Sequence, residues 1–247
     1  MKKIILILSL LMILPLADLH GNGDEISKEI IETRLNDRYS VRLKQISESE
    51  YAARKKEAER LRHKPYKVIT DIAEARKLFG KSVKQVEVYD KEQDARYSAV
   101  EIIFKDGVKK RFKWRSLDTN GFIAYYPEPG VLILNHEADG EHPIDLNDSA
   151  NEYAGNPRYH SFSPDKQLRI AGYYPGGAVD GVQYFLEKWN PKKKKYEFVG
   201  NFNDHFGENY VLSFLFAGDW FWTSNSKAVF RTITHPGYYY ELEVIEI

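Results

Sequence analysis

The residues best suited to chemistry lie in one polar segment, residues 136–148. Five imidazole and carboxylate side chains gather there: His136, Glu137, Asp139, Glu141 and His142. Imidazole and carboxylate groups are the usual protein ligands for zinc and for harder divalent cations. A bound cation would polarise a substrate and lower the pKa of its own water, so this set is a candidate site for metal-assisted hydrolysis.

The spacing of these side chains matches no standard metal site. Read as a calcium loop that begins at Asp145, the segment has Ala150 where the loop needs glycine and Asn156 where it needs glutamate. The sequence therefore favours a solvated connection between strands. Metal binding and acid–base catalysis by the same residues stay open as alternatives.

Other catalytic motifs are incomplete or missing. Gly80-Lys81-Ser82 resembles the end of a phosphate-binding loop, but Ala75 stands where that motif requires another glycine. No G-x-S-x-G or H-E-x-x-H occurs, which removes a nucleophile elbow and the common zinc-protease motif. The chain has no cysteine, so thiol nucleophiles, cysteine-ligated zinc and disulfides are excluded. We predict a protein without a cofactor, and a non-catalytic role over an enzymatic one.

Aromatic side chains are the second candidate for function. The chain has 17 Tyr, 13 Phe and 4 Trp, several of them adjacent to one another. Neighbouring residues on a strand point to opposite faces, so a one-sided sheet buries only one of each pair. Tyr and Trp offer contact area and a polar tip, which suits recognition, although a core role is the alternative for most of them. The candidate ligand-binding residues are Tyr125, Tyr126, Tyr173, Tyr174, Trp220 and Trp222.

The N-terminus has the pattern of a secretory signal peptide. Lys2 and Lys3 precede an apolar run from Ile4 to Ala17, shorter than the roughly 20 residues that a membrane-spanning helix needs. Small residues at 21–23 fit a cleavage site, with Ala17 as the alternative position. We therefore predict an exported protein, periplasmic or extracellular, with no stable membrane insertion once residues 1–23 are removed.

Charge and composition limit the partners. Lys and Arg total 36 and Asp and Glu total 36, so the formal net charge is zero. That balance argues against nucleic acid or an anionic membrane held by bulk electrostatics. Hydrophobic residues make up 43% of the chain, enough for a sizeable core. The expected partner is an exported protein or a glycan, and the sequence gives no indication of the oligomeric state.

After the signal peptide, residues 24–82 are expected to form a small helical region. Ser47 followed by Glu50 fits a capping box, and residues 48–62 are rich in helix-forming residues. A second short helix is expected over 71–79, with Thr70 or Asp71 as its N-cap and Gly80 as its terminator.

Residues 83–247 are expected to form an antiparallel β domain. Short alternating segments are separated by glycine and proline, with no long helical pattern between them. Asp106-Gly107 lies between two such segments and predicts a hairpin. The predicted fold is therefore mainly β, built from antiparallel meanders in a propeller-like or twisted-sandwich arrangement, with a small N-terminal helical region.

One segment carries a generic resemblance. Phe162-Ser163-Pro164-Asp165 resembles the aromatic-Ser-Pro-Asp turn that opens many β-propeller blades, and the stretch to Phe202 has the length of one blade with three to four strands. Trp222-Thr223-Ser224 looks like a second copy. The resemblance implies packed antiparallel meanders with blade-like repeats, and it implies no activity.

The leading functional prediction is an exported, non-catalytic binding protein that recognises a protein or a glycan through aromatic turns. A metal-assisted hydrolase using the 136–142 cluster is the first alternative. The second is a structural or inhibitory partner of an exported enzyme.

Overall fold

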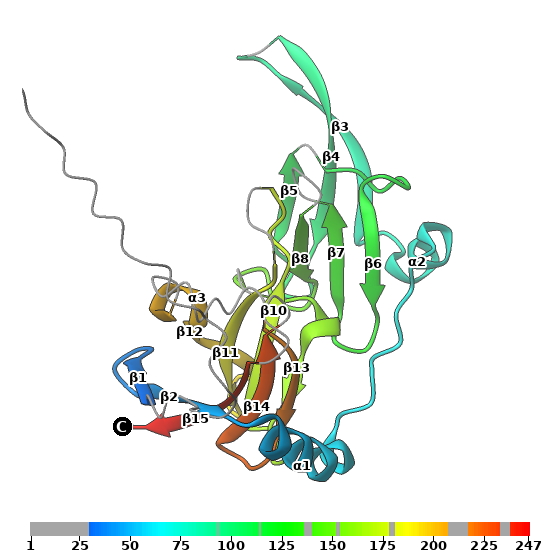
Figure 1. Cartoon of the computed structure of the whole chain (residues 1–247). Coiled ribbons are helices and arrows are strands. Elements are labelled where there is room, and N and C mark those ends of the chain that lie inside the picture. The colour runs from blue at the N-terminus through cyan, green and yellow to red at the C-terminus, as the bar shows by residue number, and fades with distance from the viewer. Residues whose placement is uncertain are drawn as a thin grey trace, which may run out of the picture.

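The computed structural model describes residues 30–92, 94–113, 115–135, 140–151, 154–177, 181–206, 217–232 and 238–247. These residues form an elongated, mainly β molecule with antiparallel sheets, as the sequence predicts (Figure 1). The strands are β1 (Ile30–Arg34), β2 (Tyr39–Ile46), β3 (Val83–Asp90), β4 (Ala95–Ile103), β5 (Lys109–Lys113), β6 (Phe122–Tyr126), β7 (Val131–Asn135), β8 (Glu141–Asp145), β9 (Ser161–Phe162), β10 (Leu168–Tyr173), β11 (Gln183–Asn190), β12 (Lys195–Asn201), β13 (Ala217–Trp222), β14 (Lys227–Thr232) and β15 (Tyr239–Glu246). The helical elements are α1 (Glu48–Ala58), η1 (Glu59–Leu61), α2 (Ile72–Phe79), η3 (Pro157–Tyr159) and α3 (Phe202–Phe206).

A five-stranded sheet joins the two ends of the described chain, in the order β1-β2-β15-β14-β13. Residues 24–82, expected to form a small helical region, contain the strands β1 and β2 in addition to the helices α1 and α2. Val41 and Leu43 alternate with polar residues, and this two-residue period buries both side chains against the core. Leu43 pairs with Leu242 of β15, so the strand obtains its hydrogen bonds from the far end of the sequence.

A four-stranded meander lies next to this sheet, in the order β12-β11-β10-β9. It is the blade-sized unit predicted for residues 162–202, and each strand pairs with the one that follows it. The main hydrophobic core lies between the meander and the five-stranded sheet, and includes Leu186 and Ile170 from one and Phe230 and Leu242 from the other. This face-to-face packing is the arrangement expected of the sandwich alternative.

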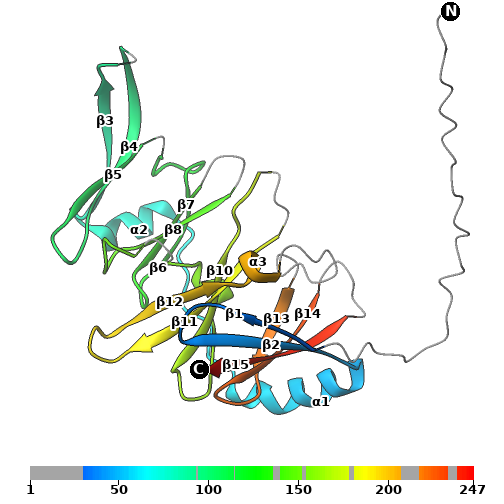
Figure 2. The ribbon, with the colours of Figure 1, turned by 90° about the vertical axis from the view of Figure 1, so that its left-hand side faces the viewer.

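The other half of the molecule is built from two three-stranded sheets, β3-β4-β5 and β6-β7-β8. Helix α2 packs with them around a second core that includes Phe79, Val100 and Leu132. The hairpin predicted at Asp106-Gly107 is confirmed, with β4 and β5 paired on either side of it. Figure 2 shows the β3–β4 hairpin at one end of the molecule and the five-stranded sheet with α1 at the other.

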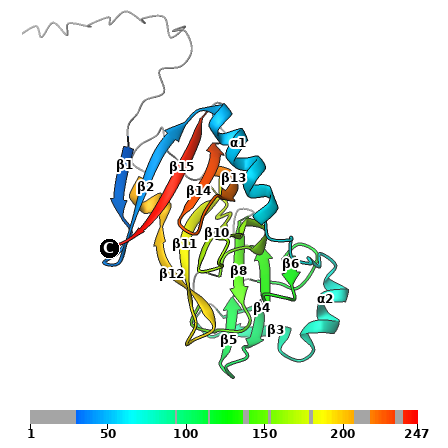
Figure 3. The same ribbon diagram turned by 90° about the horizontal axis from the view of Figure 1, so that it is seen from below.

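Helix α1 covers the outer face of the five-stranded sheet (Figure 3). Its capping box is present as predicted: the Ser47 hydroxyl accepts from the Glu50 N–H, and the Glu50 carboxylate accepts from the Ser47 N–H. Tyr51 and Ala58 bury the helix against Phe221 and its neighbours in the sheet. The chain then continues through η1 in an extended path to Ile69, which bridges to β6. None of the described helices is long and apolar enough to cross a membrane.

Candidate functional site

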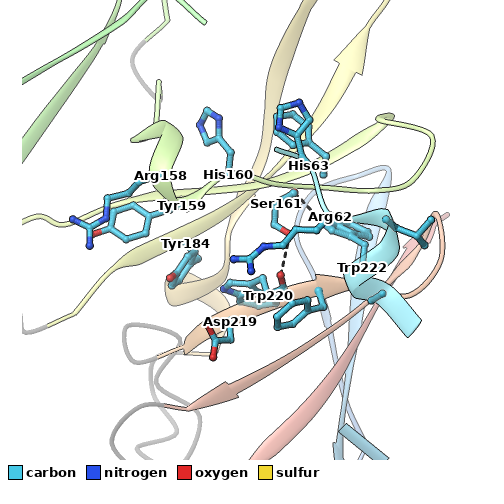
Figure 4. Close-up of a pocket in the computed structure, with 14 residues that line it drawn as sticks. Arg62, His63, Arg158, Tyr159, His160, Ser161, Tyr184, Asp219, Trp220 and Trp222 are labelled. Carbon is cyan, nitrogen blue, oxygen red and sulfur yellow. Dashed lines mark hydrogen bonds between the residues drawn. The ribbon is translucent and has the colours of Figure 1, made fainter. Parts of the chain in front are cut away.

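A pocket of ≈ 190 Å³ lies where η1, the segment around β9 and the edge strand β13 meet (Figure 4). At about 30 Å³ per water molecule it has room for about six waters, or for one ring-sized group. Aromatic side chains and polar groups share its walls, and polar atoms make up the larger part of the exposed lining. The lining residues are Ala58, Leu61, Arg62, His63, Arg158, Tyr159, His160, Ser161, Phe162, Tyr184, Asp219, Trp220, Phe221 and Trp222.

The aromatic wall is held by ring-to-ring packing in the main core. The Trp220 ring stacks on Phe230 at 4.2 Å between centroids and meets the edge of Tyr184 at 5.5 Å. Trp222 is fixed through its indole Nε1, which donates to the Ser161 carbonyl at 3.0 Å. Both tryptophans are therefore rigid, and they reach the pocket from a buried base.

A buried hydrogen bond positions the loop that supplies Arg158, Tyr159 and His160. Asn156 is buried, and its side-chain amide donates to Glu141 Oε1 at 2.9 Å. The other end of that side chain, Oδ1, accepts from the Arg158 N–H at 3.1 Å and caps η3. The loop that enters the pocket is thus fastened to β8 in the other half of the molecule.

Asp219 borders the pocket at an irregularity in β13. The register of β13 with β14 shifts between Gly218 and Phe221, and Asp219 lies in this bulge with φ +50°. Bulges redirect a side chain out of the regular alternation, and a non-glycine residue at positive φ stores strain that is often functional. The Asp219 carboxylate pairs through Oδ2 with Arg231 at 3.0 Å.

Arg62 brings a positive charge into the pocket. Its side chain extends from the end of η1 toward Trp220 and Tyr184, whereas Arg158 lies at the far end beyond Tyr159 (Figure 4). The Arg62 guanidinium carbon lies over the Phe221 ring, 5.4 Å from its centroid, in a cation–π contact. Within the described part of the chain, neither arginine forms an ion pair.

His160 is a neutral member of the site. Burial holds the pKa of its imidazole well below the ordinary value, and the positive charge of Arg169 adds to that effect. Its ring packs edge-on against Tyr66 and Phe162 at 6.1 and 6.0 Å. The positive charge of the pocket therefore comes from the arginines at neutral pH.

The phenols of the pocket are also neutral. Burial, assisted by the negative charge of Glu141, raises the pKa of Tyr159 to about 12. Burial raises the pKa of Tyr184 as well. Both hydroxyls therefore keep their protons and are suited to donate hydrogen bonds.

The six aromatic residues predicted to bind a ligand fall into two groups. Trp220 and Trp222 line this pocket together. Tyr126 is buried and Tyr125 packs edge-on against Phe79 at 4.8 Å, both in the other half of the molecule. The last two predicted residues lie where β10 ends: Tyr173 donates to Gln183 Oε1 at 2.8 Å, and the Tyr174 N–H donates to Glu141 Oε2 at 3.0 Å.

Of the predicted metal ligands, His136, Glu137 and Asp139 lie outside the described residues. Glu141 and His142 are neighbours on β8, so their side chains point to opposite faces. Glu141 accepts the hydrogen bonds described above, and the His142 ring meets the edge of Phe112 at 5.5 Å. No group of three or more metal-ligating side chains occurs among the residues that the structure describes.

A second hollow, of ≈ 720 Å³, lies between the turn at Pro129 and the β11–β12 hairpin. The cationic tip of the β11–β12 hairpin forms one wall of it, with Lys193, Lys194 and Lys195. Lys195 is not fully solvated, because it pairs with Asp148 on the opposite wall. The hollow is therefore bridged by an ion pair that links two sheets.

Sequence reasoning missed the polar half of the pocket. Arg62 has the pattern of an ordinary solvated helix residue, and Arg158 and His160 carry no motif. Asp219 follows Gly218 and precedes an aromatic triplet, and this pattern is a weak signal for a bulge. These residues meet only because η1, η3 and β13 come together in space.

Comparison with protein-family models, with curated proteins and with solved structures found no match to this chain.

Proposed function

We propose that the protein is an exported, non-catalytic glycan-binding protein whose pocket at η1, η3 and β13 takes one sugar unit. The observation that carries the proposal is the combination of a rigid aromatic wall with a few convergent polar groups in a ring-sized space. Small-molecule sites are typically concave and preformed, with a few convergent polar groups. Export is the part of the proposal that rests on the N-terminal sequence.

The chemistry of the wall suits a sugar. A sugar ring has an apolar C–H face and a polar edge, so it needs an aromatic platform beside hydrogen-bonding groups. Tyr159, which is half-buried, provides the platform, and the Tyr184 hydroxyl and the Asp219 carboxylate provide a donor and an acceptor. The buried Trp220 ring, stacked on Phe230, supports the wall from below. The tryptophans are held by packing before a ligand arrives, so little entropy is lost in ordering them.

The exposed surface favours a glycan over a protein partner. The large apolar side chains that are exposed in the described residues are scattered over β1, η1, α2, β3, β4 and β12. A protein-docking surface usually gathers such residues into a contiguous patch of a few hundred Å². The feature that concentrates aromatic area here is the concave pocket.

The experiment is a thermal-unfolding and calorimetric titration of the purified protein with a panel of neutral and acidic mono- and oligosaccharides. At about 100 times its Kd, a sugar that binds should stabilise the protein by about 2.7 kcal/mol. Tyr159→Ala removes a ring that lines the pocket and should weaken binding at least tenfold. Tyr89→Ala is the matched control, because Tyr89 is exposed on β3 and far from the pocket.

If no sugar in the panel binds, or if both tyrosine variants bind equally well, the proposal fails. Binding of a protein from the same compartment at a site unaffected by Tyr159→Ala would favour the interaction-partner alternative.

A further inference from the structure

We infer that the sugar unit bound in this pocket carries a carboxylate, and that Arg62 is the residue that contacts it. The inference rests on the proposed function and adds the chemical class of the ligand. It is carried by the placement of charge around the pocket and by the position of Arg62 beside an aromatic ring.

The charges that face the pocket do not cancel. Asp219 is the acidic residue among the lining residues, and its charge is balanced by Arg231 at 3.0 Å. Arg62 and Arg158 have no such counter-charge among the described residues, and His160 is neutral. The pocket is therefore positive, although the whole chain has no net charge. A neutral sugar would leave this charge unused, whereas an acidic sugar would neutralise it.

An aromatic ring lies beside the exposed Arg62 side chain. The Arg62 Cζ is 5.4 Å from the centroid of Phe221, and the Lys55 ammonium approaches the same ring at 4.9 Å. A guanidinium that lies over an aromatic face keeps its edge open, and that edge carries paired N–H donors that match the two oxygens of a carboxylate. The nearby ammonium of Lys55 makes the local potential more positive.

Asp219 fixes the orientation of the ligand. Asp219 lies in the bulge at the rim of the pocket, where its Oδ2 pairs with Arg231 and its Oδ1 accepts no hydrogen bond from the described residues. That oxygen is suited to accept from a sugar hydroxyl, and its negative charge repels a carboxylate. The acidic group of the ligand therefore lies toward Arg62 and a hydroxyl edge lies toward Asp219.

The test compares sugars that differ only in the carboxylate. Isothermal titration is carried out with galacturonic acid against galactose, and with glucuronic acid against glucose, at low and moderate salt. One acid should bind at least tenfold more tightly than its neutral partner, and added salt should reduce that difference. Arg62→Ala should abolish the preference, measured as the ratio of the dissociation constants of the neutral sugar and the acid.

Two further variants keep the test specific. Arg60→Ala removes an exposed arginine two residues away in the sequence, which pairs with Glu57 and does not line the pocket, so it should leave the preference unchanged. Arg62→Lys keeps the charge but loses the planar pair of donors, so it should retain only part of the preference. Circular dichroism confirms that each variant is folded.

The outcomes separate the two claims. If acidic and neutral sugars bind equally and Tyr159→Ala weakens both, the proposed function stands and the inference about Arg62 is wrong. If neither kind of sugar binds, both are wrong. Both would also be overturned if no sugar binds but a peptide with a free C-terminal carboxylate binds and Arg62→Ala abolishes that binding. The ligand would then be the C-terminus of a protein.

Discussion

The Asn156 side-chain amide donates a hydrogen bond to Glu141 Oε1 at 2.9 Å, and both residues are buried. This contact connects β8, at the edge of one half of the molecule, to the loop that carries Arg158, Tyr159 and His160 into the pocket of the other half. Glu141 was a candidate metal ligand on sequence, and in the structure it serves as an anchor for the pocket loop.

Replacing Asn156 should loosen that loop. Asn156→Ala removes the donor to Glu141 and the cap of η3, so a buried carboxylate oxygen loses a partner. The free energy of unfolding should fall by about 1–3 kcal/mol in urea denaturation. Asn120→Ala, at an exposed turn, should change it by less than about 0.5 kcal/mol. Equal stability of the two variants would show that the Glu141 contact does not hold the loop.

Removing one partner of the buried ion pair between Arg169 and Glu187 should lower the free energy of unfolding. Their side chains are 11% and 1% exposed, and burial raises the pKa of Glu187 while Arg169 opposes that rise. Arg169→Met should destabilise the fold by about 3–5 kcal/mol, because it leaves a buried charge without its partner. Arg169→Met combined with Glu187→Leu should recover at least half of the loss in the same urea measurement.

The Arg169→Met variant should also acquire a pH dependence. A carboxyl group whose pKa is raised in the folded state holds its proton more tightly when the protein is folded. Its contribution to the free energy of unfolding is therefore complete below the unfolded-state pKa and is lost as pH rises through the folded-state pKa. The variant should therefore gain stability relative to the wild type as pH is lowered from 7 toward 5. A constant difference across that range would contradict the assigned role of Glu187.

The Glu101 carboxylate should account for part of the loss of folding stability at acid pH. Lys84, Lys109 and Arg111 surround its carboxylate, and the hydrogen bond from Arg111 is the main reason that its pKa is lowered from 4.5 to about 2. Because the folded pKa is depressed, the stabilisation is present above pH 4.5 and is lost as pH falls toward 2.

Glu101→Gln should lower the urea midpoint at pH 7 and flatten its decline between pH 4.5 and 2. Glu87→Gln, on the neighbouring strand at an exposed position, should leave the pH profile of the wild type unchanged. A Glu101→Gln profile parallel to that of the wild type would exclude this carboxylate as a source of the acid sensitivity.

Local structure was predictable wherever a short-range rule decides it. The capping box at Ser47, the hairpin at Gly107 and the meander from Phe162 all follow from turn or cap chemistry between near neighbours, and all are present. The strand β2 was missed because its alternation is short and lies beside a strongly helical segment. Its register depends on β15, about 200 residues away, as the pairing of Leu43 with Leu242 shows.

The candidate site was predictable only in its apolar half. Trp220 and Trp222 stand out by residue type, because aromatic clusters are rare enough to suggest recognition. Arg62 is one of many arginines in the sequence. Its role depends on Phe221 of β13, which is distant in the sequence but in contact with Arg62 in the fold. A polar residue becomes part of a site through its neighbours in space, and single-sequence patterns do not contain them.

The most direct test of the pocket follows the indole N–H signals of the protein by nuclear magnetic resonance. Four tryptophans give four such signals, which Trp→Phe variants assign. On titration with galacturonic acid, we expect saturable shifts for Trp220 and Trp222, which line the pocket, and none for Trp189, which lies in the second hollow. Unshifted signals for Trp220 and Trp222 across the whole panel of sugars, or a shift confined to Trp189, would contradict the assignment of this pocket as a glycan-binding site.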